Sequence, residues 1–341
     1  GTAHYAWFVA ASLDGHLAGI IGAGDGFSTG YPSVQAAMQM QRPVAYFGTA
    51  GTRDFNFYNA WRRHWALDDS PLPHRFVPFE GRHSWPPKAL AKAAVEWMEL
   101  QAVRSGFAEH SSAWLKALYA AALQEAHTLE QEHCPVDALR RYQEIVRDFD
   151  GLLPIDEAKR QARALADDKQ VQKRLARQHE FAKKYDSYQA AVHDFIIQYR
   201  SQDPPPSHRQ ALRKLSIRSM QERAEDTAHP DRAAAAQRML ASAHTNLSFY
   251  GPRDFIAEKD YQRAAGLLRL AHAIYPTAPV TCYRLARAEA QLGRRQEALD
   301  ALACAFNGRG VRPEQLATDS LLDPLRNESR FQEMVAAYTA Q

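Results

Sequence analysis

The 341-residue sequence has few cysteines, little net charge and no long apolar run, and each of these absences argues against a class of protein. Its three cysteines, Cys134, Cys282 and Cys304, are an odd number without a CxxC pair, so we expect neither a disulfide framework nor a zinc or other metal site. All three are expected to be buried thiols. Lys and Arg outnumber Asp and Glu by only 42 to 39 without a basic cluster, which argues against nucleic-acid binding. No apolar run approaches the roughly 20 residues that span a bilayer.

What is present is typical of a soluble globular protein with two or three domains, since 45% of the residues are apolar and 24% are charged. The chain opens on Gly1-Thr2-Ala3, with neither an initiator methionine nor a signal segment. We therefore expect upstream sequence to be missing, and any N-terminal targeting segment with it. The compartment stays open, with a periplasmic or secreted location favoured.

The first hundred residues alternate short apolar runs with segments of helical periodicity, which predicts an α/β fold with about three parallel strands. The expected strands cover residues 17–21, 43–47 and 74–79. The expected helices cover residues 3–13, 34–40, 58–66 and 88–102. Such a short parallel sheet would leave apolar edges and faces uncovered, so several upstream strands are expected as well.

A histidine and a carboxylate follow neighbouring strands of this sheet. Asp54 comes after the second strand and His83 after the third. Ligands of open α/β sheets bind beyond the carboxyl ends of the strands, so we expect the two side chains to meet there. In a hydrolase, such an imidazole takes the proton of a nucleophile and the carboxylate orients the imidazole. His64 and His74 lack this setting and are expected to be solvated.

Two further motifs precede Asp54. Residues 26–30 match G-x-S-x-G around Ser28, but the serine stands well past the first strand and Pro32 delays the following helix. Residues 20–27 are similar to a dinucleotide fingerprint, but Phe27 stands at its third glycine position and no acidic residue ends the second strand. A dinucleotide-dependent oxidoreductase is therefore the least supported function.

With Asp54 and His83 in this order, residues 1–104 resemble the C-terminal half of a bacterial α/β-hydrolase of the esterase, dienelactone-hydrolase-like or polyester-depolymerase-like type. That family carries its triad in the order Ser, Asp, His. The resemblance implies a nucleophilic serine immediately before Gly1, with the Gly1 amide in the oxyanion hole. Thr2 then stands where the motif has its second glycine, and Ser28 is the alternative nucleophile.

The resemblance implies a serine hydrolase that needs no cofactor and acts on an ester or related acyl bond of a small or polymeric substrate. Without its nucleophile, the chain alone is expected to be inactive. Phe27, Phe55 and Trp85 are the aromatic residues nearest to the site and are expected to line an acyl or alcohol pocket, with core or lid packing as the alternative. The competing function is a non-catalytic scaffold with a hydrolase-like pseudoenzyme module.

From about residue 105 the strand signals end and an all-α region is predicted. Small and apolar residues recur there at an offset of 34. Ala264, Leu268 and Ala271 are followed by Ala298, Leu302 and Ala305. This spacing resembles tetratricopeptide (TPR) repeats, in which stacked helix pairs form a concave groove. The resemblance implies a protein or peptide partner in that groove.

Four segments are therefore expected. Residues 1–104 form the hydrolase-like part, 105–200 a degenerate helical-repeat block, 201–230 a proline-rich linker with a basic helix, and 231–341 TPR-like repeats with a C-terminal cap. The basic helix is expected at residues 209–223, packed against the repeats rather than on a membrane.

Overall fold

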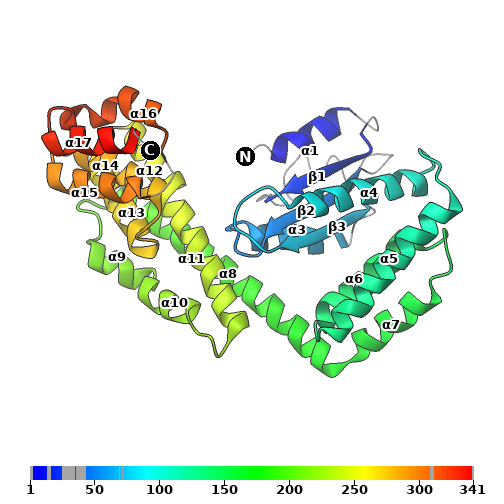
Figure 1. Cartoon of the computed structure of the whole chain (residues 1–341). Coiled ribbons are helices and arrows are strands. Elements are labelled where there is room, and N and C mark those ends of the chain that lie inside the picture. Colours follow the sequence, from blue (N-terminus) through cyan, green and yellow to red (C-terminus); the bar gives the residue numbers. More distant parts are fainter. Residues whose placement is uncertain are drawn as a thin grey trace. The chain divides into compact units, whose positions relative to one another are not determined.

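The computed structural model describes residues 3–13, 17–24, 35, 44–68, 70, 72–307 and 311–339 (Figure 1). The chain divides into two compact units, Gly1–Lys184 and Tyr185–Gln341. The boundary falls inside one long helix, α8 (Lys169–Ser201). The four segments expected from the sequence remain a prediction.

The first unit contains a parallel sheet of three strands in the order β1-β2-β3. The strands are β1 (Gly19–Ala23), β2 (Ala45–Gly51) and β3 (His74–Phe79). Every residue of the central strand β2 is buried, as expected for a parallel strand that is covered on both faces. The predicted α/β sheet of three parallel strands is confirmed, whereas the structure does not test the expected upstream strands.

Helices cover both faces of this sheet (Figure 1). Tyr46 and Phe47 are neighbours in β2, so their side chains point to opposite faces. The Tyr46 ring lies 5.0 Å from the ring of Trp7, which belongs to α1 (Ala3–Ser12). The Phe47 ring lies 5.7 Å from that of Trp97, in α4 (Lys88–Arg104). Helix α3 (Phe57–Asp68) follows β2, and apart from residue 35 the expected helix 34–40 lies outside the described residues.

The rest of the first unit is helical. It comprises α5 (Ser112–Gln131), α6 (Pro135–Phe149), α7 (Asp156–Asp167) and the first half of α8. Helix α6 is strongly amphipathic, and Ala138, Tyr142, Ile145 and Phe149 recur along it at intervals of three or four residues and are all buried. This apolar stripe packs against α5 and α7.

A buried polar network fastens α6 to the sheet. The Asp148 carboxylate of α6 accepts hydrogen bonds from Trp97 Nε1 and Gln101 Nε2 of α4, each at 3.1 Å. It also pairs directly with Arg75 of β3, whose Nε lies 3.3 Å from Glu144 Oε2. All these side chains are buried. One carboxylate thus joins a strand and two helices.

The second unit is helical throughout its described residues. After the end of α8 and two short helices described below, its elements are α11 (Pro230–Thr245), the π-helical turn η1 (Asn246–Tyr250), α12 (Gly251–Ala257), α13 (Tyr261–Ile274), α14 (Pro279–Gln291), α15 (Arg295–Phe306), α16 (Pro313–Thr318), the 3₁₀ segment η2 (Ser320–Leu325) and α17 (Ser329–Thr339).

The helices α13, α14 and α15 pack against one another in sequence, and the residues that recur at the 34-residue offset lie in their contacts. Ala264 and Ala298, which the offset aligns, are both fully buried. Alanines at these positions let neighbouring helices approach closely. Gly293 turns the chain between α14 and α15 at φ +71°, a conformation that glycine adopts without strain. The predicted TPR-like packing is confirmed for this part of the chain.

Two sequence expectations are corrected in the second unit. The single helix expected at residues 209–223 is broken into α9 (His208–Lys214) and α10 (Ile217–Ala224). Ser216 lies between them at φ +51°, which ends the helical path, and its neighbours Leu215 and Ile217 are both buried in the core.

No described helix is long and apolar enough to cross a bilayer.

The second correction concerns the cysteines. Cys282 of α14 and Cys304 of α15 form a disulfide, so the expectation that all three are free thiols is wrong. Cys134, at the start of α6, is free and only partly buried. The two bonded cysteines are 22 residues apart in the sequence and meet only because α14 and α15 form an antiparallel hairpin.

We predict that Asp148→Ala destabilises the protein by about 3–5 kcal/mol, because it leaves the Arg75 guanidinium buried without its main partner. Urea denaturation measures the change. The control is Asp150→Ala, which removes only a surface ion pair with Lys159 and should change stability by less than about 0.5 kcal/mol. Equal effects of the two substitutions would show that the buried network does not stabilise the packing of α6 against the sheet and α4.

Candidate functional site

The loops beyond the carboxyl ends of β2 and β3 lie against each other. The Thr52 amide donates to Phe79 O and the Arg53 amide to Gly81 O, both at 2.8 Å. Gly51 permits this approach, because a Cβ there would lie 2.3 Å from the carbonyl oxygen of Arg82. The two loops therefore continue the strand pairing for a few residues and bring their polar side chains together.

Asp54 and His83 meet at this edge of the sheet. His83 Nδ1 lies 2.9 Å from Asp54 Oδ2 and 3.1 Å from Oδ1. The Asp54 side chain is fully buried, whereas half of the His83 side chain is exposed. Since the carboxylate accepts the Nδ1 proton, neutral His83 carries its free lone pair on Nε2. Within the described residues no other hydrogen bond involves the His83 ring.

Asn56 holds the carboxylate in place. Its backbone amide donates to Asp54 Oδ1 at 2.8 Å, and its Nδ2 donates to the carbonyl oxygen of Gly24 at 2.8 Å. The residue thereby ties the loop after β2 to the end of β1. We did not single it out from the sequence, although an Asp followed two residues later by Asn before a helix is typical of a side-chain-capped turn.

Gly24 closes the site from the β1 side. It has φ +59°, and a Cβ there would lie 2.8 Å from both Asp54 Oδ2 and His83 Nδ1. Its amide donates to Thr49 O at 2.7 Å, which fixes the backbone against β2. The pair is thus packed against a glycine backbone, so the ends of all three strands contribute to one site.

The pair changes the acidity of the imidazole. The hydrogen bond to Asp54 raises the pKa of His83 above its ordinary value, and the negative charge of Asp54 acts in the same direction. Partial burial of the ring opposes this shift without cancelling it. His83 is therefore set up to accept a proton and to hold it as an imidazolium beside a buried carboxylate.

The aromatic residues expected at the site differ in their placement. The Phe55 ring lies 4.6 Å from the His83 ring and packs against it. Trp85 is 87% exposed, so its side chain extends into solvent, and its role in a pocket stays a prediction. Gly1, Phe27 and Ser28 lie outside the described residues.

The expectation that His64 and His74 are solvated is wrong, since both are buried. Together with Asp68 they form one group of described residues with the composition of a metal site. His74 Nδ1 bonds to Leu72 O at 2.9 Å and its Nε2 lies 3.0 Å from Asp68 Oδ1. Burial lowers the pKa of His64 to about 3.

Arg147 of α6 already supplies a cation to this group. Its Nη1 lies 3.1 Å from Asp68 Oδ1 and 3.5 Å from His74 Nε2. A metal bound between the same atoms would have to displace the guanidinium. The group therefore functions in this structure as a second polar link between α6 and the sheet.

Comparison with known protein families gives one local match. The sequence model described as "Tetratricopeptide repeat" matches residues 255–304, which contain α13, α14 and most of α15. Searches of the curated proteins and of the solved structures gave no match. The comparisons thus support the TPR-like region and do not connect residues 1–104 with the α/β-hydrolases.

We predict that Asp54→Asn lowers the pKa of His83, because it removes the carboxylate charge and weakens the acceptor. Proton NMR titration of the His83 ring should give a value above about 6.5 in the unaltered protein and a lower value in the variant. Glu80→Gln is the matched control, since Glu80 is an exposed carboxylate on the same edge that pairs with Arg53 instead. An unchanged His83 titration in Asp54→Asn would contradict the observed pairing.

The same pair makes a pH-dependent contribution to stability. Because the folded-state pKa of His83 is raised, this contribution is fully present below the unfolded value of about 6.5 and is lost as the pH rises through the folded-state pKa. Asp54→Asn should remove that dependence from the unfolding free energy measured between these limits. Half of the imidazole is exposed, so solvent screening keeps the contribution small.

Gly24→Ala is expected to separate Asp54 from His83. Left-handed backbone alone costs an alanine about 1–2 kcal/mol. Gly106→Ala measures that cost separately, because Gly106 has φ +73° but no atom within 4 Å of an added Cβ. Gly24→Ala should lose more stability than Gly106→Ala in urea denaturation and should also lower the His83 pKa. Equal losses and an unchanged titration would show that the close approach is unimportant.

Proposed function

We propose that residues 1–104 contribute the acid and base of a serine hydrolase that cleaves an ester or a related acyl bond. The observation that carries the proposal is the hydrogen bond between His83 Nδ1 and the fully buried Asp54 carboxylate, at the carboxyl edge of a parallel sheet. The order of the two residues and their separation on adjacent strands agree with the α/β-hydrolase pattern.

In this mechanism His83 Nε2 is the reacting atom. It takes the proton of a serine hydroxyl while the serine oxygen bonds to the acyl carbon. Asp54 stabilises the resulting imidazolium and keeps the ring in the productive tautomer. The imidazolium then gives its proton to the departing oxygen, which leaves as an alcohol. Water then attacks the acyl carbon while His83 Nε2 takes a proton from it. The imidazolium returns this proton to the serine oxygen, which releases the acid product and the free serine.

The nucleophile of this proposal is the serine that the family pattern places directly before Gly1. The Gly1 amide would then stabilise the oxyanion. Ser28, from the G-x-S-x-G match, is the alternative. The chemistry needs no cofactor. Phe55, which packs on the His83 ring, is the first candidate for the wall of an acyl or alcohol pocket.

A TPR repeat supports a protein-interaction scaffold, and this favours a second candidate function. In it, the repeats recruit a protein or peptide and the hydrolase-like part is a non-catalytic module. The two candidates differ in whether the Asp54–His83 pair serves a reactive serine. The partner on the repeat groove is part of both proposals.

Labelling by a fluorophosphonate probe separates the two candidates. The protein tested is the longest gene-encoded form that contains residues 1–341. We expect one labelled serine, and a loss on the order of 10⁴-fold in turnover of a chromogenic ester in Asp54→Asn and in His83→Ala. Ser84→Ala and Glu80→Gln are controls at exposed neighbouring positions and should retain activity.

Peptide mapping of the labelled serine identifies the nucleophile. A label on Ser28 would show that Ser28, and not a serine upstream of Gly1, is the nucleophile. Labelling that Asp54→Asn and His83→Ala leave unchanged would overturn the assigned pair, and an unreactive protein would favour the scaffold.

A further inference from the structure

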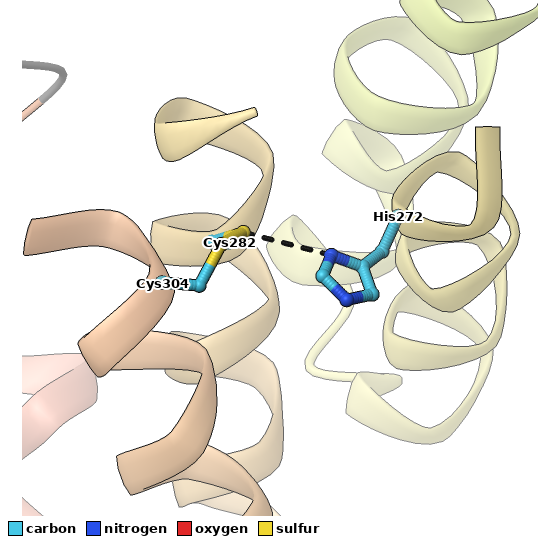
Figure 2. Close-up of side chains that lie close together, drawn as sticks. All are labelled: His272, Cys282 and Cys304. Carbon is cyan, nitrogen blue, oxygen red and sulfur yellow. Dashed lines mark hydrogen bonds between the residues drawn. A yellow bond between two sulfur atoms is a disulfide. The ribbon is translucent and has the colours of Figure 1, made fainter. Parts of the chain in front are cut away.

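A second cluster of reactive side chains lies in the TPR-like region, apart from the proposed hydrolase residues. It comprises His272 of α13, Cys282 of α14 and Cys304 of α15, so three consecutive helices each contribute one residue (Figure 2). The sulfurs of the two cysteines are bonded. His272 Nδ1 points at this bond and lies 3.5 Å from Cys282 Sγ.

We propose that these three side chains bind a zinc ion when the disulfide is reduced, so that the Cys282–Cys304 bond and a bound metal are alternative states of one site. Zinc favours thiolate and imidazole ligands, and two cysteines with one histidine are an established ligand type. All three potential ligand atoms lie within 4.8 Å of one another.

The separation between the His272 nitrogen and the Cys282 sulfur matches that of two ligands in a tetrahedral zinc site. Zinc bonds of about 2.3 Å to sulfur and 2.0–2.1 Å to nitrogen place the two ligand atoms about 3.6 Å apart at the tetrahedral angle. The observed separation of His272 Nδ1 and Cys282 Sγ is 3.5 Å. Two zinc-bound thiolates stand about 3.8 Å apart on the same geometry, a spacing that rotation of the cysteine side chains can reach once the disulfide is open.

The surroundings suit metal binding. Cys282 is fully buried, whereas Cys304 is partly exposed and gives a reductant and a metal ion access from one side. Three protein ligands leave a fourth position for water.

Reduction of the disulfide precedes zinc binding. A dithiol reductant transfers two electrons and two protons to the disulfide, giving two thiols, and is itself oxidised to a disulfide. Zinc binding then releases both thiol protons, since the thiolates are the ligands. In an oxidising compartment the disulfide form prevails. Either state links α14 to α15 through the two sulfurs, but only the metal adds a coordinate bond to His272 of α13.

Cobalt titration of the whole chain tests the proposal. After reduction by a phosphine, which does not add competing thiols, the protein should bind one Co²⁺ with a thiolate-to-metal charge-transfer band that added Zn²⁺ abolishes. The oxidised protein should show no such band. Cys282→Ser, Cys304→Ser and His272→Gln should each weaken binding by more than the roughly 10–100-fold that loss of an outer-shell partner costs.

Cys134→Ser is the matched control, because Cys134 is the cysteine outside the cluster, and it should bind Co²⁺ like the unaltered protein. Alkylation of the unaltered reduced protein adds a measurement that needs no variant to fold. Zn²⁺ should protect Cys282 and Cys304 but not Cys134. Absence of the band in the reduced protein, or equal alkylation of the three cysteines with and without Zn²⁺, would overturn the proposal.

Discussion

The buried carboxylate of Asp148 is the constraint on which the first unit depends. It pairs with the Arg75 guanidinium of β3 and accepts hydrogen bonds from Trp97 and Gln101 of α4. Removal of one partner of a buried ion pair costs several kcal/mol, so these contacts favour keeping β3, α4 and α6 together. Residues 80–87, which carry His83, run from β3 to α4. The strand before the His83 loop and the helix after it therefore both contact this one side chain.

The His83 loop completes a site that no single strand could form. β1 supplies the backbone of Gly24, β2 leads to Asp54 and Asn56, and β3 leads to His83. Parallel strands bring their carboxyl ends to one edge, so residues far apart in the sequence become neighbours. The buried Asp54 carboxylate raises the pKa of the half-exposed His83 imidazole and orients its ring, an arrangement suited to proton transfer.

The strands and the Asp54–His83 contact could be predicted because each follows from a local pattern, an apolar run that ends in polar residues. The TPR-like packing was equally readable, since alanines at a fixed offset mark close helix contacts. Other features depend on tertiary neighbours. The disulfide needs the α14–α15 hairpin, and Arg147 of α6 reaches the buried His74. The left-handed Ser216 lies between two residues that are both buried in the core. The role of Gly24 appears only when His83 is packed against it.

The disulfide closes within one helical hairpin and does not cross to the next pair of helices. In a repeat array, each unit has its own stability and a separate coupling to its neighbours. This covalent closure therefore strengthens a unit and leaves the coupling to noncovalent contacts such as those of the buried alanines. When the ends of the array fray or are pulled apart, α14 and α15 should remain joined as one block while the stacking on either side gives way first.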